Sequence, residues 1–197
     1  MPPTTATSRH RRTGSRRDPA IDAAVLAAAR RLLVEHGYAG TSIDLIATTA
    51  GVSRPAVYRR WESKAHLVHA AVFPDLDADA PCDALADEIV RLCHGAVRMY
   101  ADPAIREAIP GLLHDLRGDD EMRRLISGRL EAAVRAQLAQ RLADAVDQQA
   151  VRASVSADTL LDAIAGGAWY AVCVREVSDP DATATELAEM ILRGILR

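Results

Sequence analysis

Residues 41–64 hold the side chains best suited to chemistry, and that chemistry is the binding of a polyanion. They are Thr41, Ser42, Ser53, Arg54, Tyr58, Arg59, Arg60 and Lys64. Hydroxyl and ammonium groups suit the phosphate oxygens of a nucleic acid, and a guanidinium group can fork onto the edge of guanine. Lys64 is the only lysine among the 24 basic residues, and it lies at the end of this segment.

Local signals place these side chains on two short helices joined by a turn. The run from Thr41 to Asp44 has the pattern of a capping box, and the helix that it opens should end near residue 50. Gly51 permits a tight turn. Ser53 can cap a second helix over residues 54–61, because a proline in the first turn loses only an N–H that the helix does not use.

The apolar residues of the segment explain how the two helices would hold each other. Ile46, Val52 and Val57 fall where two crossed helices meet, and Ala47 is small at their closest contact. A rigid pair of this kind can present its second helix to the major groove of DNA. The sequence therefore predicts a helix-turn-helix. The outward residues of its second helix are Arg54, Ala56, Arg59 and Arg60.

The composition favours helices and divides the chain by charge. Ala supplies much of the apolar share, and the 197 residues include only one Phe, two Trp and four Tyr, so we expect an all-α fold of about nine helices. Residues 1–73 carry 11 Lys and Arg against 5 Asp and Glu, whereas residues 74–197 carry 13 against 22. Positive charge in the segment that holds the motif supports DNA binding.

The composition and the helix signals divide the chain into three segments. Residues 1–17 have the composition of a disordered basic arm, which either touches DNA or only solubilises the protein. Residues 18–73 form the DNA-binding domain with a connecting helix, and residues 74–197 form a larger helical domain. Outside the motif we expect helices over 18–36, 65–73, 83–100, from 103 with a kink at 110–111, 120–146, 156–177 and 183–196. Asp83 and a capping box at 183–186 should open two of them.

The run TSIDLIATTAGVSRPAVYRRWESK, from Thr41 to Lys64, resembles the DNA-binding segment of the TetR family of transcriptional regulators. The resemblance extends over residues 18–73. It implies phosphate contacts for Thr41, Ser42, Tyr58 and Lys64. It implies contacts with base edges for Arg54, Pro55, Ala56 and Arg59, and either role for Arg60.

The sequence departs from the commonest family pattern at Pro55, Ala56, Arg60 and Trp61, where Gly, Thr or Ser, His, and Phe are frequent. These residues make the helix more rigid and more basic, and the bases of the operator do not follow from the resemblance. Trp61 is expected to pack the small core. Tyr58 either packs there or contacts phosphate.

The resemblance also implies a role for residues 74–197 in ligand binding and dimerisation. The last two helices would pair with those of a second copy, so that a homodimer reads a palindromic operator in double-stranded DNA. A small-molecule effector would bind among the middle helices and release this repressor. The candidate pocket residues are Cys93, His94, Met99, Tyr100, Leu113, His114, Arg117, Trp169, Tyr170 and Cys173. Each also fits a packed core or a solvated helix face.

Rival functions use other features of the sequence. A thiol- or metal-responsive regulator would need Cys93, His94 and Cys173 together, but no CxxC or HxxxH spacing occurs. A DNA-binding architectural protein would need no effector. An enzyme is disfavoured, because neither a phosphate-cradling glycine loop nor a nucleophile elbow is present. We expect no cofactor, no metal, no membrane span and a cytoplasmic location, with the three cysteines as reduced thiols.

Overall fold

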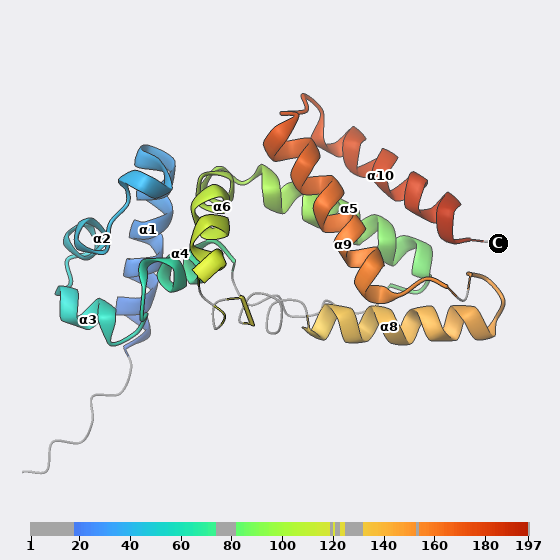
Figure 1. The fold of residues 1–197 in the computed structure, drawn as a ribbon, viewed down its shortest axis with the longest axis horizontal. Helices are drawn as coiled ribbons and strands as arrows, with labels where there is room; N and C mark the ends of the chain where they lie inside the picture. Colours follow the sequence, from blue (N-terminus) through green and yellow to red (C-terminus); the bar gives the residue numbers. More distant parts are fainter. Residues whose placement is uncertain are drawn as a thin grey trace, which may run out of the picture.

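The computed structural model describes residues 18–73, 82–118, 120, 123–124, 132–152 and 154–196. These residues form nine α-helices, a 3₁₀ turn and a π-helical turn (Figure 1). The all-α fold predicted from composition is therefore confirmed. Three predicted features lie wholly or partly outside the described residues: the basic arm of residues 1–17, residues 74–81 before and within the acidic stretch, and residues 121–122 and 125–131 of the helix predicted over 120–146.

Four helices form the N-terminal part of the molecule. They are α1 (Pro19–Gly40), α2 (Ile43–Thr49), α3 (Arg54–Tyr58) and α4 (Lys64–Val72). The start of α1 follows the predicted Asp-Pro signal, because the side chain of Asp18 accepts a hydrogen bond from the N–H of Ala20 at 3.0 Å. Gly37 has a φ of 65° and interrupts α1 near its end, as expected of a left-handed glycine.

The remaining helices form the larger part of the molecule. They are α5 (Leu85–Ala101), α6 (Pro103–Asp115), α8 (Ala132–Asp147), α9 (Ala157–Trp169) and α10 (Pro180–Ile195). The 3₁₀ turn η1 (Leu116–Gly118) follows α6, and the π-helical turn η2 (Tyr170–Val174) extends α9. The single helix predicted over 156–177 is thus an α-helix with a π-helical end.

Several helix starts differ from the sequence-based expectation. The N-cap of α2 is Ser42, whose side-chain oxygen accepts a hydrogen bond from the N–H of Leu45. The prediction of a capping box from Thr41 to Asp44 was therefore wrong. The cap position of α5 is Ala84 and not Asp83.

The last helix also starts at a different residue from the predicted one. Asp179 caps α10 by accepting from the N–H of Ala182 at 2.9 Å, and Pro180 occupies the first turn. The capping box predicted at 183–186 was therefore wrong. The reason is physical: the Asp-Pro pair satisfies an exposed N–H earlier in the chain, as it does in α1.

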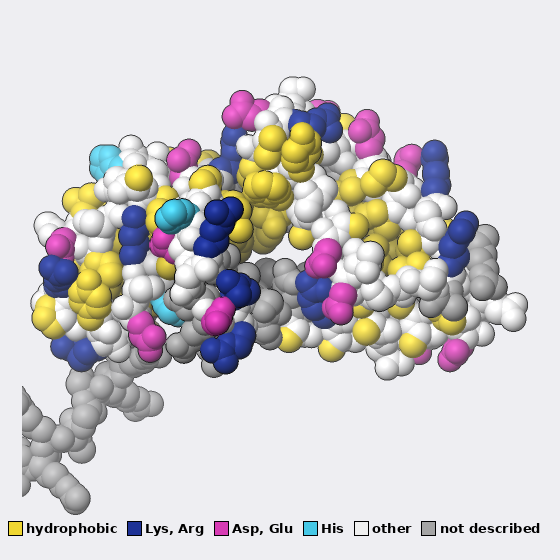
Figure 2. Space-filling model, viewed as in Figure 1, with side chains coloured by type: hydrophobic (Ala, Val, Ile, Leu, Met, Phe, Trp, Pro, Cys, Tyr) yellow, Lys and Arg dark blue, Asp and Glu magenta, His cyan; other side chains and the backbone are white. Residues whose placement is uncertain are grey.

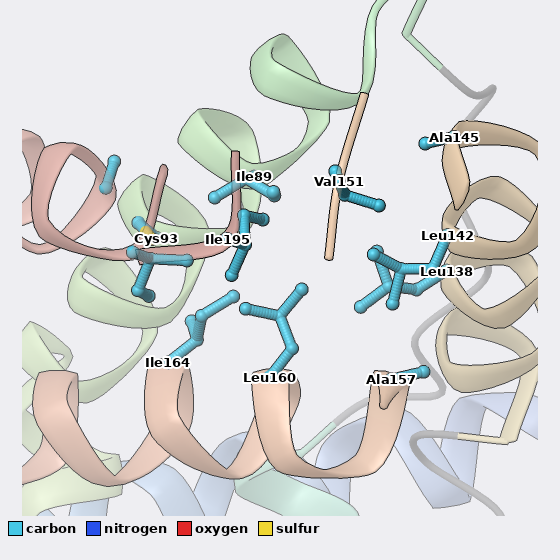
Figure 3. Packing of buried hydrophobic residues seen from close by; sticks show 12 residues of the cluster. Ile89, Cys93, Leu138, Leu142, Ala145, Val151, Ala157, Leu160, Ile164 and Ile195 are labelled. Carbon is cyan, nitrogen blue, oxygen red and sulfur yellow. The ribbon is translucent and has the colours of Figure 1, made fainter. Parts of the chain in front are cut away.

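Two apolar cores hold the two ends of the molecule. Helices α1, α2, α3 and α4 enclose a core built around Val25, Ile46, Val57 and Leu67, which are fully buried. At the other end, α5, α8, α9 and α10 converge on a second core, in which Leu138 of α8 faces Leu160 of α9 (Figure 3). The first core fixes the position of α3, and the second fixes the positions of α9 and α10.

A third apolar cluster joins α6 to the N-terminal helices. It contains Leu33 of α1, Val68 and Val72 of α4, and Ile105 and Leu112 of α6. Figure 1 shows α6 between the N-terminal helices and the layer of α5, α9 and α10. Because α6 contacts α1 and α4 directly, the N-terminal part is packed onto the larger part through this helix. Among the described residues, no helix is long and apolar enough to cross a membrane.

Candidate functional site

Helices α2 and α3 meet at the predicted apolar contacts. Ile46, Ala47 and Val57 are buried between them, and Val52 and Trp61 pack against the same core at its edge. Gly51, with a φ of 68°, turns the chain between the two helices. The helix-turn-helix geometry and the core role of Trp61 are therefore confirmed.

The outer face of α3 exposes most of the residues predicted to bind DNA. Ser42, Ser53, Arg54, Pro55, Tyr58 and Arg59 are all exposed. Ser53 makes no side-chain cap, so its hydroxyl is not used in the helix start. Tyr58 is 43% exposed, which places its ring on the surface and not in the core. Lys and Arg side chains appear at this end of the molecule, and also over its middle and its other end (Figure 2). The arrangement suits contact with a polyanion.

The exposed guanidinium of Arg54 contacts two neighbouring side chains, Asp44 and Tyr58. Its Nη1 donates to Asp44 Oδ2 at 3.2 Å, and its Nε lies 3.0 Å from Oδ1 of the same carboxylate. Its Nη2 donates to the hydroxyl of Tyr58 at 3.4 Å, and its guanidinium lies 5.4 Å from the centre of the Tyr58 ring. The hydrogen bond with Tyr58 and the charge of Asp44 both raise the pKa of Arg54.

Three predicted DNA contacts have internal partners instead. Arg60 is nearly buried, pairs with Asp22 of α1 and donates to the carbonyl of Ala56 at 3.1 Å. Ala56 itself is 8% exposed. Thr41 is 1% exposed, and its hydroxyl donates to the carbonyl of Gly37 at 2.8 Å. In this geometry these three residues stabilise the domain and offer little to a ligand.

Lys64 lies at the start of α4, where it contacts the end of α1. Its ammonium group donates to the carbonyl of Tyr38 at 2.5 Å and lies 3.9 Å from the centre of the Tyr38 ring. Burial lowers the pKa of Lys64, and the charge of Asp115 opposes that shift. Lys64, which was predicted to contact phosphate, therefore connects α4 to the end of α1 in this geometry.

Tyr38 is the centre of a contact that we call the α6 junction, formed by Tyr38, Lys64, Gly111 and Asp115. The hydroxyl of Tyr38 donates to Asp115 Oδ2, and this bond together with burial raises the pKa of Tyr38. The ring lies so close to Gly111 that a Cβ atom there would be 1.9 Å from Tyr38 Cδ1. The sequence analysis did not identify Tyr38 or Asp115, since neither belongs to a local motif.

A second polar contact fixes the other end of the same interface. Arg30 of α1 donates to Asp102 at 2.5 Å and to the carbonyl of Ala71 at 3.1 Å. Asp102 also caps α6 by accepting from the N–H of Ala104 at 2.8 Å. The helix α6 is thus held against α1 and α4 at both of its ends.

A cavity of about 320 Å³ lies on the side of α6 that faces α5 and α9. Its lining is almost entirely apolar and consists of Phe73, Tyr100, Ile109, Leu112, Leu113, Ala165, Gly166 and Trp169. A second hollow of about 530 Å³ shares Ile109, Leu113 and Trp169 with it and adds the charged side chains of Arg106, Glu107 and Glu176. Apolar cavities with a few polar groups are typical of small-molecule sites.

The predicted pocket residues divide between this cavity and other environments. Tyr100, Leu113 and Trp169 line the first cavity, and Cys173 lines the second hollow. Met99 packs into the adjoining apolar cluster. His114, Arg117 and Tyr170 are exposed. Phe73 and Ile109, which the sequence analysis did not select, also line the cavity.

Cys93 and His94 take separate structural positions. Cys93 is buried in the core of α5, α8, α9 and α10, where burial raises the pKa of its thiol to about 11. The ring of His94 lies 3.7 Å from Asp181 and 3.4 Å from Thr185, both on α10. Within the described ranges, no cluster of His, Cys, Asp and Glu suited to a metal ion occurs.

The comparisons with known proteins agree with this geometry along the chain. Residues 25–71 match the model of bacterial regulatory proteins of the tetR family, and residues 74–191 match the tetracyclin repressor-like C-terminal domain. The chain belongs to the TetR family. It is a DNA-binding transcriptional regulator of that family.

Relatives in sequence and in structure extend over most of the chain. An uncharacterized HTH-type transcriptional regulator of Mycobacterium tuberculosis is 30% identical over 145 residues, which cover 72% of this chain and 71% of that protein. A TetR-family regulator from Rhodococcus sp. has a TM-score of 0.64 at 17% identity and covers 87% of this chain and 98% of its own. FadR of Bacillus subtilis, in complex with stearoyl-CoA, has a TM-score of 0.65 at 15% identity, with 88% and 98% covered. The structural neighbours support the fold.

The close approach at Gly111 predicts a stability effect. Alanine is favoured over glycine inside a helix by up to about 1 kcal/mol. In Gly111→Ala the new methyl group must displace the ring of Tyr38, so we expect a net loss of about 1–3 kcal/mol in the free energy of unfolding, measured in urea at one protein concentration. Gly95→Ala, inside α5 with open space around the new Cβ, is the matched control and should be neutral or stabilising. Equal stability of the two variants would contradict the packing described here.

Proposed function

We propose that this regulator is a homodimeric repressor that leaves a palindromic operator when a small apolar molecule occupies the cavity beside α6. The observation that carries the proposal is the position of α6. One side of this helix lines the cavity through Ile109, Leu112 and Leu113, and other residues of the same helix contact Tyr38 and the DNA-binding helices. Ligand binding and DNA binding would therefore act on one shared element.

The DNA-binding part of the proposal rests on the exposed face of α3. Arg54 and Arg59 are exposed there, and arginine can donate two hydrogen bonds to guanine. Ser42, Ser53 and Tyr58 offer hydroxyl groups at the edge of this face for phosphate oxygens. A two-fold dimer would set two such faces about one helical turn of DNA apart, roughly 34–36 Å, which predicts a palindromic operator.

Selection of genomic DNA fragments by the purified protein tests this part. We expect a palindrome, and we expect Arg59→Ala to weaken its binding by about tenfold or more, because a good arginine-to-base contact contributes about 1–3 kcal/mol of discrimination. Salt-sensitive binding without any preferred sequence would instead support the architectural alternative.

The dimer part of the proposal rests on α9 and α10, which lie side by side (Figure 1). Large apolar side chains stay exposed along them and along η2: Tyr170, Val174, Met190 and Leu196. Gly166 and Gly194 leave open space where a side chain would stand. Exposed apolar surface beside small residues is suited to helix packing against a second copy.

A charge on α10 should weaken this dimer. Met190 is 63% exposed, so Met190→Arg should leave the subunit folded but shift the dimer towards monomer in sedimentation equilibrium, since an unpaired charge would be buried in the interface. Val34→Arg on α1, where Val34 is 53% exposed, is the control and should not change the association. A wild-type monomer at micromolar concentration would overturn the dimer.

The effector part of the proposal rests on the apolar cavity. An uncharged aromatic or aliphatic compound would bury its surface against Phe73, Tyr100 and Trp169. By thermodynamic linkage, a compound that prefers the conformation with low DNA affinity must lower DNA affinity by its preference ratio. The effect would pass through α6 to α1 and α4.

A filled cavity should abolish the response. Compounds from an uncharged apolar panel that raise the melting temperature of the free protein should weaken operator binding. Ala165→Phe places a ring in the cavity, so it should abolish both effects while the variant still binds DNA. Val90→Phe, on an exposed position of α5, is the control and should keep both. An unchanged response in Ala165→Phe would place the effector elsewhere.

A further inference from the structure

The pair formed by Asp44 and Arg54 is unusual for a surface that should attract DNA. Asp44 belongs to the first turn of α2, is exposed, and lies within hydrogen-bond distance of the residue that begins the recognition helix α3. A carboxylate on this face repels phosphate groups, and it does not cap α2, because Ser42 does. A carboxylate in the first turn of α2 also suits the helix dipole. That role would be met without the contact between Asp44 and Arg54, so the contact needs an explanation of its own.

We propose that Asp44 is a specificity-determining positioning residue. It holds the guanidinium of Arg54 in a position to contact the edge of one base, and it lowers the attraction of Arg54 for phosphate groups. The proposal rests on the DNA-binding function proposed above. It concerns a residue that contacts Arg54 and not one that must itself touch DNA.

The geometry supports a positioning role. Arginine carries five N–H donors. One of them donates to Asp44, at 3.2 Å, and one donates to the hydroxyl of Tyr58, at 3.4 Å. The guanidinium is thereby held from two sides, by α2 and by the next turn of α3. Its Nε also lies 3.0 Å from Asp44 Oδ1, so one N–H on each of Nη1 and Nη2 stays available for a base edge. An arginine fixed in this way loses less rotamer entropy when it binds a base.

The charge of the pair supports selectivity in a second way. The carboxylate lies next to the guanidinium and cancels much of its attraction for phosphate, which is the part of DNA binding that does not depend on sequence. Hydrogen bonds to a base edge depend on direction and survive this cancellation. Asp44 should therefore lower affinity for random DNA more than it lowers affinity for the operator.

The pair is weak enough to be removed without unfolding the domain. The side chains of Arg54 and Asp44 are 58% and 62% exposed, and exposed ion pairs contribute little to stability. Asp44→Asn should therefore fold normally. Glu62→Gln, between α3 and α4, removes the same charge from an exposed position of the same domain and is the matched control.

The experiment selects random-sequence duplexes with wild type, Asp44→Asn, Asp44→Glu, Glu62→Gln and Arg54→Ala. Arg54→Ala should lose the preference for one base position in each half-site. Asp44→Asn should weaken the preference at that same position and reduce the ratio of operator to random-DNA affinity by about tenfold, within the range of a single arginine-to-base contact. Asp44→Glu keeps the carboxylate and should recover part of the preference.

The double variant and the control decide between positioning and simple charge. If Asp44 acts through Arg54, Asp44→Asn should have little further effect on base preference in the Arg54→Ala background. Glu62→Gln should keep the wild-type preference. An Asp44→Asn variant with wild-type preference, or one that changes a different position from Arg54→Ala, would overturn the proposal. Failure of wild type itself to select any sequence would instead overturn the proposed function.

Discussion

The contact of Tyr38 with Gly111 sets how closely α1 can approach α6. The ring occupies the volume where any other residue at position 111 would carry its Cβ, so the two helices can meet only because that residue is glycine. Leu33, Val68 and Leu112 are then buried in the same interface. Interiors are packed as densely as organic crystals, so a displacement of α6 cannot be absorbed locally and must move its neighbours.

The polar groups of this interface are arranged so that α1 and α4 move with α6. Tyr38 bonds to Asp115 at one end, and Arg30 bonds to Asp102 at the other. Lys64 and Ala71, near the two ends of α4, contact Tyr38 and Arg30 respectively. The recognition helix precedes α4 directly in the chain. Its orientation relative to the larger part of the molecule therefore depends on these few hydrogen bonds and on the apolar surface between them.

The features that depend on residues close together in the chain could be predicted from the sequence. The Asp-Pro start of α1, the left-handed Gly37 and the apolar contacts of the helix-turn-helix all depend on residues close together in the chain. Two capping boxes were misplaced, because another acceptor, Ser42 or Asp179, satisfied the helix start first.

Contacts between residues far apart in the chain could not be predicted from local sequence patterns. Tyr38 and Asp115 are 77 residues apart, and Arg60 meets Asp22 across 38 residues. Composition and periodicity cannot show that an arginine of the recognition helix turns inward, since an exposed and a paired arginine have the same sequence signature. The same reason explains why Tyr100, Leu113 and Trp169 could be selected for the cavity from their residue types, whereas Phe73 and Ile109 could not.

The position of the cavity limits how an effector could act. A ligand shifts an equilibrium only by the difference between its affinities for the two conformations, however tightly it binds. A cavity far from the DNA-binding helices would need a chain of intermediate movements to create such a difference. Here Leu112 and Leu113 line the cavity within one helical turn of Gly111 and Asp115, so a ligand that displaces the wall also displaces the groups that hold Tyr38. Under the proposed function, the difference in affinity would then depend on how much free energy the α6 junction loses when the ligand binds, as well as on the contacts of the ligand with the cavity lining.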